Sequence, residues 1–273
     1  MSDRPHTGIE LLLSDIDGTL LRPDHSLSEA TIAAVGRLRD AGIGFTVASS
    51  RPPRAMRSII EALGVDLPTV AFNGGTITDA DGKLLVAHRI PESAARTCLR
   101  LFAEHEVAVW VFADDQWLLL DLAGEYVAHE RDTLGYDPLL VDTFDPWLDR
   151  VDKIVASSGD FELLKRLEAR VNPLIDGQAL AARSQAYYLD VTALAANKGS
   201  ALAALARHLK VPLASTAAIG DGGNDVAMFR QAGLSIAMGQ AEAVVANQAD
   251  RITGSNLQDG VAMAIERFIL AAR

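Results

Sequence analysis

The stretch Leu-Leu-Leu-Ser-Asp-Ile-Asp-Gly-Thr-Leu at residues 11–20 sets an apolar strand directly before two aspartates and a turn glycine. A carboxylate is a weak nucleophile in water, but at the end of a buried strand, with Mg2+ screening the incoming anion, it can attack a phosphoryl group. Gly18 lets the backbone approach a phosphate closely because it carries no side chain. Asp15 and Asp17 are therefore the natural pair for metal-assisted chemistry.

Apolar runs alternate with helical patterns around this stretch. In the first part of the chain they lie, in order, at 9–13, 26–41, 43–48, 53–63 and 70–72. This βαβαβ order predicts a parallel sheet. Ser26 and Glu29 form a possible capping box at the start of the first helix, and Gly42 is its expected stop.

The same alternation returns late in the chain. The expected elements are a helix at 198–209, a strand at 217–220, a helix at 225–232, a strand at 234–238 and a terminal helix ending near Ala272. These segments can complete the sheet that the first part begins. The predicted core therefore comes from two separate pieces of the chain.

The middle of the chain has a different composition. All three Trp and all four Tyr fall between residues 110 and 188. The expected elements are a hairpin of 107–113 with 117–121 across a turn at 114–116, strands at 152–156 and 186–191, and a helix at 161–171. The predicted fold class is α/β: a Rossmann-like parallel-sheet core, residues 1–82 and 191–273, interrupted by an α+β cap at 83–190.

Composition and charge narrow the function classes. The 273 residues carry a formal charge of −11 and show no basic run, which disfavours nucleic acid as a partner. An acidic protein that binds a small phosphate needs a metal or local cations in its site, so the charge balance predicts a metal. The six histidines show no metal-ligand spacing, so zinc is not expected.

The compartment can also be predicted from the sequence. A single cysteine, Cys98, cannot form an intrachain disulfide and favours a reducing compartment. There is no signal-peptide pattern at the N-terminus, and no apolar stretch is long enough to suggest a membrane span. We expect a cytoplasmic protein without a membrane partner.

Polar residues follow each apolar run of the predicted sheet. In an open parallel sheet, ligands bind beyond the carboxyl ends of the strands. The residues at these ends are Asp15 and Asp17, then Ser49, Ser50 and Arg51, then Asn73, Gly74 and Gly75, and finally Gly-Asp-Gly-Gly-Asn-Asp at 220–225. Lys198, near the start of the helix after the insert, can deliver a cation to the same edge.

A calcium loop is the main structural alternative for closely spaced aspartates. Such a loop needs oxygen ligands at positions 1, 3 and 5 and glycine at position 6. Counted from Asp15, Leu20 falls at position 6; counted from Asp221, Gly223 falls at position 3 and Val226 at position 6. Both registers fail, which favours the catalytic interpretation.

Five motifs together resemble the haloacid-dehalogenase-like (HAD) hydrolase superfamily, in particular its Cof-type phosphatases with a large α/β cap of the C2B type. The matching pieces are Asp-Ile-Asp-Gly-Thr-Leu at 15–20, Ala-Ser-Ser-Arg at 48–51, Asn-Gly-Gly at 73–75, Asn-Lys-Gly at 197–199 and Gly-Asp-Gly-Gly-Asn-Asp-Val-Ala-Met-Phe at 220–229. They cover both halves of the core in the right order. The cap resembles the family in length and position only.

The resemblance implies a role for each matching residue, and the implied catalytic residues are Asp15, Asp17, Ser49 and Lys198. Asp15 would attack the phosphoryl group, and Asp17 would protonate the leaving alcohol and then activate water. The implied phosphate-binding residues are Ser49, Ser50, Asn73, Gly74, Lys198, Asn224 and Arg51. Ser-Ser at 49–50 departs from the Thr-Gly that is more usual in the family. Arg51 either reaches the substrate or pins its loop, and Asn73 either forms a turn or binds beside the phosphate.

The resemblance also implies Mg2+ as the cofactor. The implied metal-site residues are Asp15, Asp17 through its backbone carbonyl, Asp221, Asn224 and Asp225, the last two in support. Asp225 can at the same time cap the helix that follows it.

The predicted function is a Mg2+-dependent phosphatase acting on small phosphorylated metabolites through an aspartyl phosphate. Sugar phosphates are the first candidate substrates, followed by phosphorylated cofactors such as pyridoxal phosphate or flavin mononucleotide. A phosphomutase on the same scaffold and a noncatalytic binding protein are the alternatives. The sequence does not identify the substrate, because the cap has a distinct composition but no recognisable motif. It does not identify the oligomeric state either.

Overall fold

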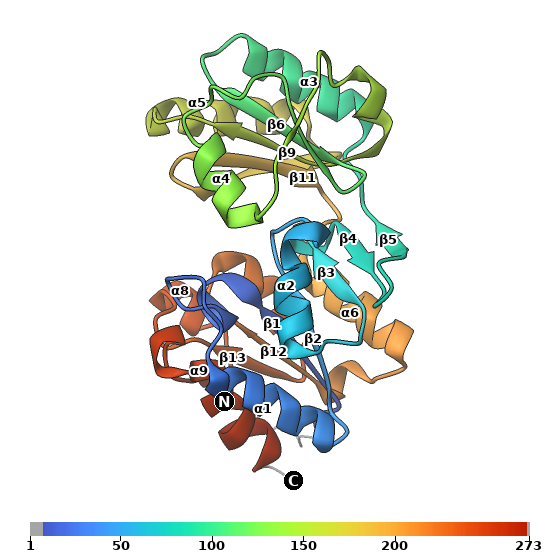
Figure 1. The fold of residues 1–273 in the computed structure, drawn as a ribbon, viewed down its shortest axis with the longest axis vertical. Coiled ribbons are helices and arrows are strands. Elements are labelled where there is room, and N and C mark those ends of the chain that lie inside the picture. The colour runs from blue at the N-terminus through green and yellow to red at the C-terminus, as the bar shows by residue number, and fades with distance from the viewer. Residues whose placement is uncertain (1–7, 272–273) are drawn as a thin grey trace. The chain divides into compact units, whose positions relative to one another are not determined.

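The computed structural model describes residues 8–271 and places the run at 11–20 in the middle of an eight-stranded sheet (Figure 1). β1 (Leu11–Asp15) pairs in parallel with β12 (Thr216–Gly220) on one side and with β2 (Gly44–Ala48) on the other. Every residue of β1 is buried, as expected for a strand of a parallel sheet that is covered on both faces.

The first sheet has the order β14-β13-β12-β1-β2-β3-β4-β5. Its remaining strands are β3 (Thr69–Ala71), β4 (Thr76–Thr78), β5 (Leu84–Ala87), β13 (Leu234–Ala237) and β14 (Arg251–Ile252). The strands from β14 to β3 are parallel, and β4 pairs antiparallel with β3. The predicted fold class is confirmed.

Helices connect these strands. They are α1 (Glu29–Asp40), α2 (Pro53–Leu63), α6 (Lys198–Leu209), α7 (Val226–Phe229), α8 (Ala243–Ala246) and α9 (Gly260–Ala264). The chain moves across the sheet in one direction from β1 through β2 to β3, and in the opposite direction from β12 to β13. Because connections between parallel strands are right-handed, α1 and α2 lie on one face of the sheet and α7 lies on the other. The helix expected at 225–232 is shorter than predicted, since a tight turn at Gly223–Asp225 precedes it. The expected helix end near Ala272 lies outside the described residues.

The predicted capping box of α1 is wrong. Ser28, not Ser26, is the N-cap, and its hydroxyl accepts a hydrogen bond from the backbone N of Thr31. The backbone N and the hydroxyl of Ser26 instead donate to the carboxylate of Asp24. A Ser-Leu-Ser sequence offers two serines for one cap, and the one that is buried beside the first turn forms it.

A second compact unit comprises Arg51–Ala55 and Val86–Ala196. Its sheet has the order β10-β11-β9-β6-β7-β8. The strands are β6 (Ala108–Ala113), β7 (Gln116–Leu119), β8 (Leu139–Leu140), β9 (Val151–Ser157), β10 (Ala179–Gln185) and β11 (Tyr188–Ala193), and the helices are α3 (Glu92–Ala103), α4 (Val127–Leu134) and α5 (Phe161–Val171). The strand expected at 186–191 begins later, because Ala186 and Tyr187 form the turn after β10.

The two faces of this second sheet are covered differently. Helices α3 and α5 pack on one face, whereas α4 lies on the other (Figure 1). The apolar core between the sheet and its two helices includes Phe102, Val111, Ile154, Leu167 and Leu189. Sequence patterning did not predict α3, α4, β8 or β10.

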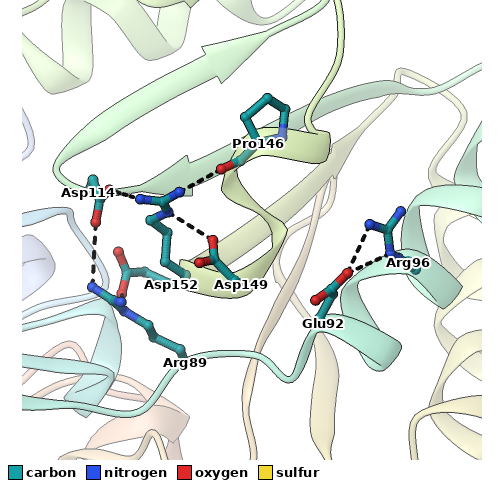
Figure 2. Close-up of polar contacts among 8 residues, drawn as sticks. Arg89, Glu92, Arg96, Asp114, Pro146, Asp149 and Asp152 are labelled. Carbon is teal, nitrogen blue, oxygen red and sulfur yellow. Dashed lines mark hydrogen bonds and ion pairs between the residues drawn. The ribbon is translucent and has the colours of Figure 1, made fainter.

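The hairpin of β6 and β7 has the turn predicted for it, although Gln116 belongs to the second strand. Asp114 and Asp115 both have positive φ, 50° and 60°, which is typical of a two-residue hairpin turn. Figure 2 shows the carboxylate of Asp114 between two arginines: Arg89 at 3.5 Å and Arg150 at 3.3 Å. These two ion pairs tie the turn to the segments that precede α3 and β9.

No helix in the described part of the chain is long and apolar enough to cross a membrane.

Candidate active site

Three carboxylates meet at the carboxyl edge of the first sheet. Asp15 is the last residue of β1, and Asp221 directly follows the neighbouring parallel strand β12. Each of Asp15, Asp221 and Asp225 contributes a carboxylate oxygen to a group whose members all lie within 4.8 Å of one another. The strand-end rule thus brings together residues that lie far apart in the sequence.

Lys198 supplies the cation of this cluster. Its side chain is fully buried, and its Nζ donates to Oδ1 of Asp15 and, at 2.6 Å, to Oδ1 of Asp225. Burial alone would lower the pKa of Lys198, but the two carboxylates outweigh that effect and raise it. Lys198 is therefore a permanent positive charge beside the Asp15 carboxylate.

Asp225 organises the loop after β12. Its Oδ2 accepts hydrogen bonds from the backbone N atoms of Asp221 and Gly222, both at 2.9 Å. Its other oxygen accepts from Lys198, so both carboxylate oxygens have protein partners. This arrangement suits a residue that positions Asp221 and Lys198.

Asp17 lies in the turn at Ile16–Leu20, outside this carboxylate group. Its side chain is 40% exposed, and its Oδ1 lies 4.0 Å from Nδ1 of His25. Gly18 has a φ of +77°, and a Cβ at this position would overlap the Asp221 carboxylate. Glycine is therefore required for the turn to approach the acidic cluster.

The loops after β2 and β3 are joined by backbone hydrogen bonds. The buried Ser49 donates its backbone N–H to the Val70 carbonyl at 3.0 Å, and its own carbonyl accepts from the backbone N of Asn73 at 2.8 Å. Ser50, next in the chain, is half-buried. The Ser-Ser pair thus occupies a well-anchored strand end.

Asn73 and Asn224 are brought into direct contact. Oδ1 of Asn73 accepts from Nδ2 of Asn224 at 2.9 Å, which links the loop after β3 to the loop after β12. Gly74 has a φ of +104°, and a Cβ there would overlap the carbonyl of Asn197, the N-cap of α6. The close approach of these two segments therefore depends on glycine at 74.

Arg51 groups with the second unit rather than with the other predicted residues. Its Nη1 donates to the Thr133 carbonyl at 3.2 Å. This contact supports the loop-pinning alternative for Arg51.

The acidic cluster fits a divalent cation. Asp15, Asp221 and Asp225 carry three negative formal charges against the single positive charge of Lys198, which leaves an excess of negative charge. Burial raises the pKa of both Asp15 and Asp221, and the neighbouring Asp225 raises each further. Hard oxygen donors with excess negative charge are the ligand set that Mg2+ prefers.

Two residues that the sequence analysis did not identify contact this cluster or the turn at Ile16–Leu20 beside it. Oγ1 of Thr19 donates to Oδ1 of Asp221 at 3.1 Å. Nε2 of Gln240 donates to the Gly18 carbonyl at 2.5 Å, while its Oε1 accepts from the backbone N of Asn256. Gln240 follows β13, so the strand-end rule would have found it if applied to that strand also.

Comparisons with known proteins point to one family. Residues 12–265 match the sequence profile of the haloacid dehalogenase-like hydrolases. A protein of Escherichia fergusonii named HMP-PP phosphatase is 32% identical over 230 residues, covering 83% of each chain. A haloacid dehalogenase-like hydrolase from B. subtilis has a TM-score of 0.84 at 26% identity, covering 95% of this chain and 100% of that one. A phosphatase of the HAD superfamily from Bacteroides thetaiotaomicron has a TM-score of 0.82 at 27% identity, covering 98% of both chains.

Proposed function

The chain belongs to the haloacid dehalogenase-like hydrolase family and is a phosphatase of that family, and we propose that it hydrolyses small phosphate monoesters through a phosphorylated Asp15. The family resemblance of the five sequence motifs is confirmed. The observation that carries the proposal is the buried Lys198, whose ammonium touches both Asp15 and Asp225. The positive charge of Lys198 stabilises the ionised carboxylate of Asp15 at the end of β1, although the carboxylates of Asp221 and Asp225 lie close by.

Asp15 is the proposed nucleophile. Its carboxylate oxygen attacks phosphorus, the bond to the leaving alcohol breaks, and the phosphoryl group is carried on the side chain. Asp17 donates a proton to the leaving oxygen and then takes a proton from the water that hydrolyses the aspartyl phosphate. The greater exposure of Asp17 suits this exchange of protons with an alcohol and with water.

Mg2+ is the proposed cofactor. Asp15, Asp221 and the backbone carbonyl of Asp17 would hold it, with Asn224 and Asp225 in support. When bound, it supplies positive charge that offsets the charge of the phosphate.

The phosphate would be bound at the same sheet edge. We assign this role to Ser49, Ser50, Asn73, Gly74, Lys198 and Asn224, and we assign Arg51 to the anchoring of its own loop through the Thr133 carbonyl. The hydrogen bond between Asn73 and Asn224 supports it for these two, because it holds both amides beside the loop that carries Asp221. Preorganised donors of this kind stabilise developing negative charge without reorganisation during the reaction.

We propose small phosphorylated metabolites as substrates. Sugar phosphates, phosphorylated cofactors and HMP-PP are the first candidates to test. The last is suggested by the 32% identical HMP-PP phosphatase. A cytoplasmic location agrees with the single cysteine, Cys98, which is buried and unpaired in the second unit.

A phosphate-release screen tests the proposed function. Purified protein with Mg2+ should release inorganic phosphate from members of a phosphorylated-metabolite library, and excess chelator should abolish the release. Positional isomerisation of a sugar phosphate without phosphate release would favour the mutase instead. An absence of turnover across the library, with no binding of an aspartyl-phosphate mimic at Asp15, would favour the noncatalytic alternative.

Replacing Gln240 with alanine should weaken Mg2+ binding. The substitution removes the hydrogen bond that holds the Gly18 carbonyl beside the Asp17 backbone, and residues that orient metal ligands commonly contribute roughly 10-fold or more to affinity. The measurement is the Mg2+ concentration that gives half of the full thermal stabilisation of the protein.

Gln248→Ala is the matched control, because Gln248 is exposed and its side chain accepts a hydrogen bond from Arg230 rather than from the turn. An unchanged Mg2+ requirement in Gln240→Ala would show that the turn keeps its shape without this contact.

A further inference from the structure

The turn at Ile16–Leu20, which carries Asp17, is not a regular helix. A backbone hydrogen bond from the N of Leu21 to the carbonyl of Ile16, at 3.0 Å, closes it. Within the turn, Asp17 has a φ of −80° and a ψ of 126°, and Gly18 has a φ of +77°. Because these non-helical residues interrupt the helical hydrogen-bond pattern, the backbone carbonyls of the turn need partners from elsewhere in the chain.

Asn256, in the loop after β14, holds two of these carbonyls. Its Nδ2 donates to the Leu21 carbonyl at 2.8 Å, and its backbone N donates to Oε1 of Gln240 at 3.1 Å. Gln240 in turn donates from Nε2 to the Gly18 carbonyl. A side-chain amide has one donor end and one acceptor end, so the contact with Asn256 fixes which end of Gln240 faces the turn. Asn256 therefore acts on Leu21 directly and on Gly18 through Gln240.

The loop that carries Asn256 is itself braced. Ser255 donates from its backbone N and from its hydroxyl to Oε1 of Gln258, at 3.2 Å in each case. The backbone N of Gly239 donates to the Gly254 carbonyl at 3.0 Å, which ties the loop after β13 to the loop after β14. Supporting groups that are locked in this way can hold a reacting side chain in a narrow range of positions.

A third contact lies where the chain leaves the turn. Nη2 of Arg22 lies 2.9 Å from Oδ1 of Asp259, which follows Asn256 in the same loop. The two side chains are 37% and 31% exposed, so water screens this ion pair and it contributes little by itself. The hydrogen bonds to the Gly18 and Leu21 carbonyls are therefore the contacts that set the position of the turn.

We propose that Asn256 is a positioning residue for Asp17, and that it holds the turn where the Asp17 carboxyl can protonate the leaving oxygen. The proposal rests on the proposed function, in which Asp17 is the general acid. Proton transfer requires the acid within hydrogen-bond distance of the leaving oxygen, and a misplacement of about 1 Å can cost roughly 100-fold in rate. The nucleophile should be spared, because Asp15 is held separately, by β1 and by Lys198.

The dependence of the rate on the leaving group tests this proposal. 4-Nitrophenolate leaves without being protonated, whereas an alkoxide needs a proton from an acid. Asn256→Ala should lower kcat/KM by about 100-fold for an alkyl phosphate, with glucose 6-phosphate as the first one tested, but by only a few fold for 4-nitrophenyl phosphate. The parameter kcat/KM includes only the steps up to departure of the leaving group, so the later hydrolysis of the aspartyl phosphate does not contribute. Saturating Mg2+ removes any effect of a weakened metal affinity.

Matched variants separate positioning from general damage. Asn256→Asp keeps the size of the side chain but cannot donate to the Leu21 carbonyl as a carboxylate, so it should behave as Asn256→Ala does. Asn247→Ala, which changes an exposed asparagine at the end of α8, should leave both rates unchanged. In an Asp17→Asn background, Asn256→Ala should cause no further difference between the two esters, since the acid is already absent.

Hydrogen–deuterium exchange gives a readout that needs neither substrate nor metal. In metal-free protein, Asn256→Ala should speed exchange of the peptide at 16–22 by about tenfold or more, because hydrogen bonds that hold the turn are lost. Exchange within β1 should not change.

Equal losses of kcat/KM for the two esters would show that Asn256 has only a structural role, and unchanged exchange at 16–22 would show that the turn keeps its shape without it. Either result overturns the proposal. If the wild type hydrolysed neither ester, the proposed function would have failed, and faster exchange in Asn256→Ala would still support the anchoring of the turn by Asn256.

Discussion

Asp15→Asn is expected to reduce turnover by on the order of 10^4-fold or more, because an amide cannot replace the carboxylate as a nucleophile. The fold should survive. The substitution takes one negative charge from a buried cluster in which three carboxylates face one ammonium, and burial already raises the pKa of Asp15. The measurements are phosphate release under saturating Mg2+ and thermal melting in the same buffer.

Two further observations separate loss of the nucleophile from general damage. Beryllium fluoride, an aspartyl-phosphate mimic, should stabilise the wild type against melting but leave Asp15→Asn unaffected. Asp24→Asn changes an exposed carboxylate in the loop after the same turn, and it should retain activity within a few fold. If Asp15→Asn kept its turnover, the nucleophile would have to be another residue.

The sheet edge was predictable because parallel topology converts a local pattern into a spatial one. Each apolar run ends at the same edge, so Asp15, Ser49 and Asp221 could be placed together from their positions after the runs alone. The same logic failed for Gln240 only because the residues after β13 were not considered. Thr19 gave no comparable signal, since a threonine inside a turn is usually explained by the turn itself.

The second unit was less predictable, and its elements show why. In α3 the buried positions Ala94, Ala95, Cys98, Leu101 and Phe102 follow a helical period, but small residues make the apolar stripe weak. Along β10 only Ala179 and Ala181 are buried, so its exposed end shows no alternation. Short or half-exposed elements like these are fixed by tertiary packing rather than by local pattern.

The ion pair between Lys153 of β9 and Asp190 of β11 could not be inferred from the sequence for another reason. The two residues become neighbours through the antiparallel register of β9 and β11, in which Val155 faces Asp190. A shift of that register by one residue would turn one set of side chains to the opposite face. Register is set by packing across the whole sheet. The sequence alone therefore does not show that Lys153 and Asp190 become neighbours.

Lys198→Met is expected to lower the free energy of unfolding of the metal-free protein by about 3–5 kcal/mol. This is a large share of the total unfolding free energy of a typical domain. The ammonium is fully buried and contacts Asp15 and Asp225, so its removal leaves both carboxylates without their cation. Turnover should also fall in Lys198→Met, because Lys198 is the cation that offsets the charge of the nucleophile. Denaturant unfolding at neutral pH measures the loss, and Lys165→Met on the exposed face of α5 is the matched control, expected within about 0.5 kcal/mol.

The double variant Lys198→Met with Asp225→Asn should be less destabilised than Lys198→Met alone. The amide introduced by Asp225→Asn keeps an oxygen that can accept from the backbone of Asp221 and Gly222, while one of the uncompensated charges is gone. A carboxyl group whose pKa is raised by burial holds its proton more tightly in the folded state, so Lys198→Met should also regain stability as the pH falls toward about 4. Equal stability of the single and double variants, with no gain at low pH, would mean that Lys198 contributes through packing rather than through its charge.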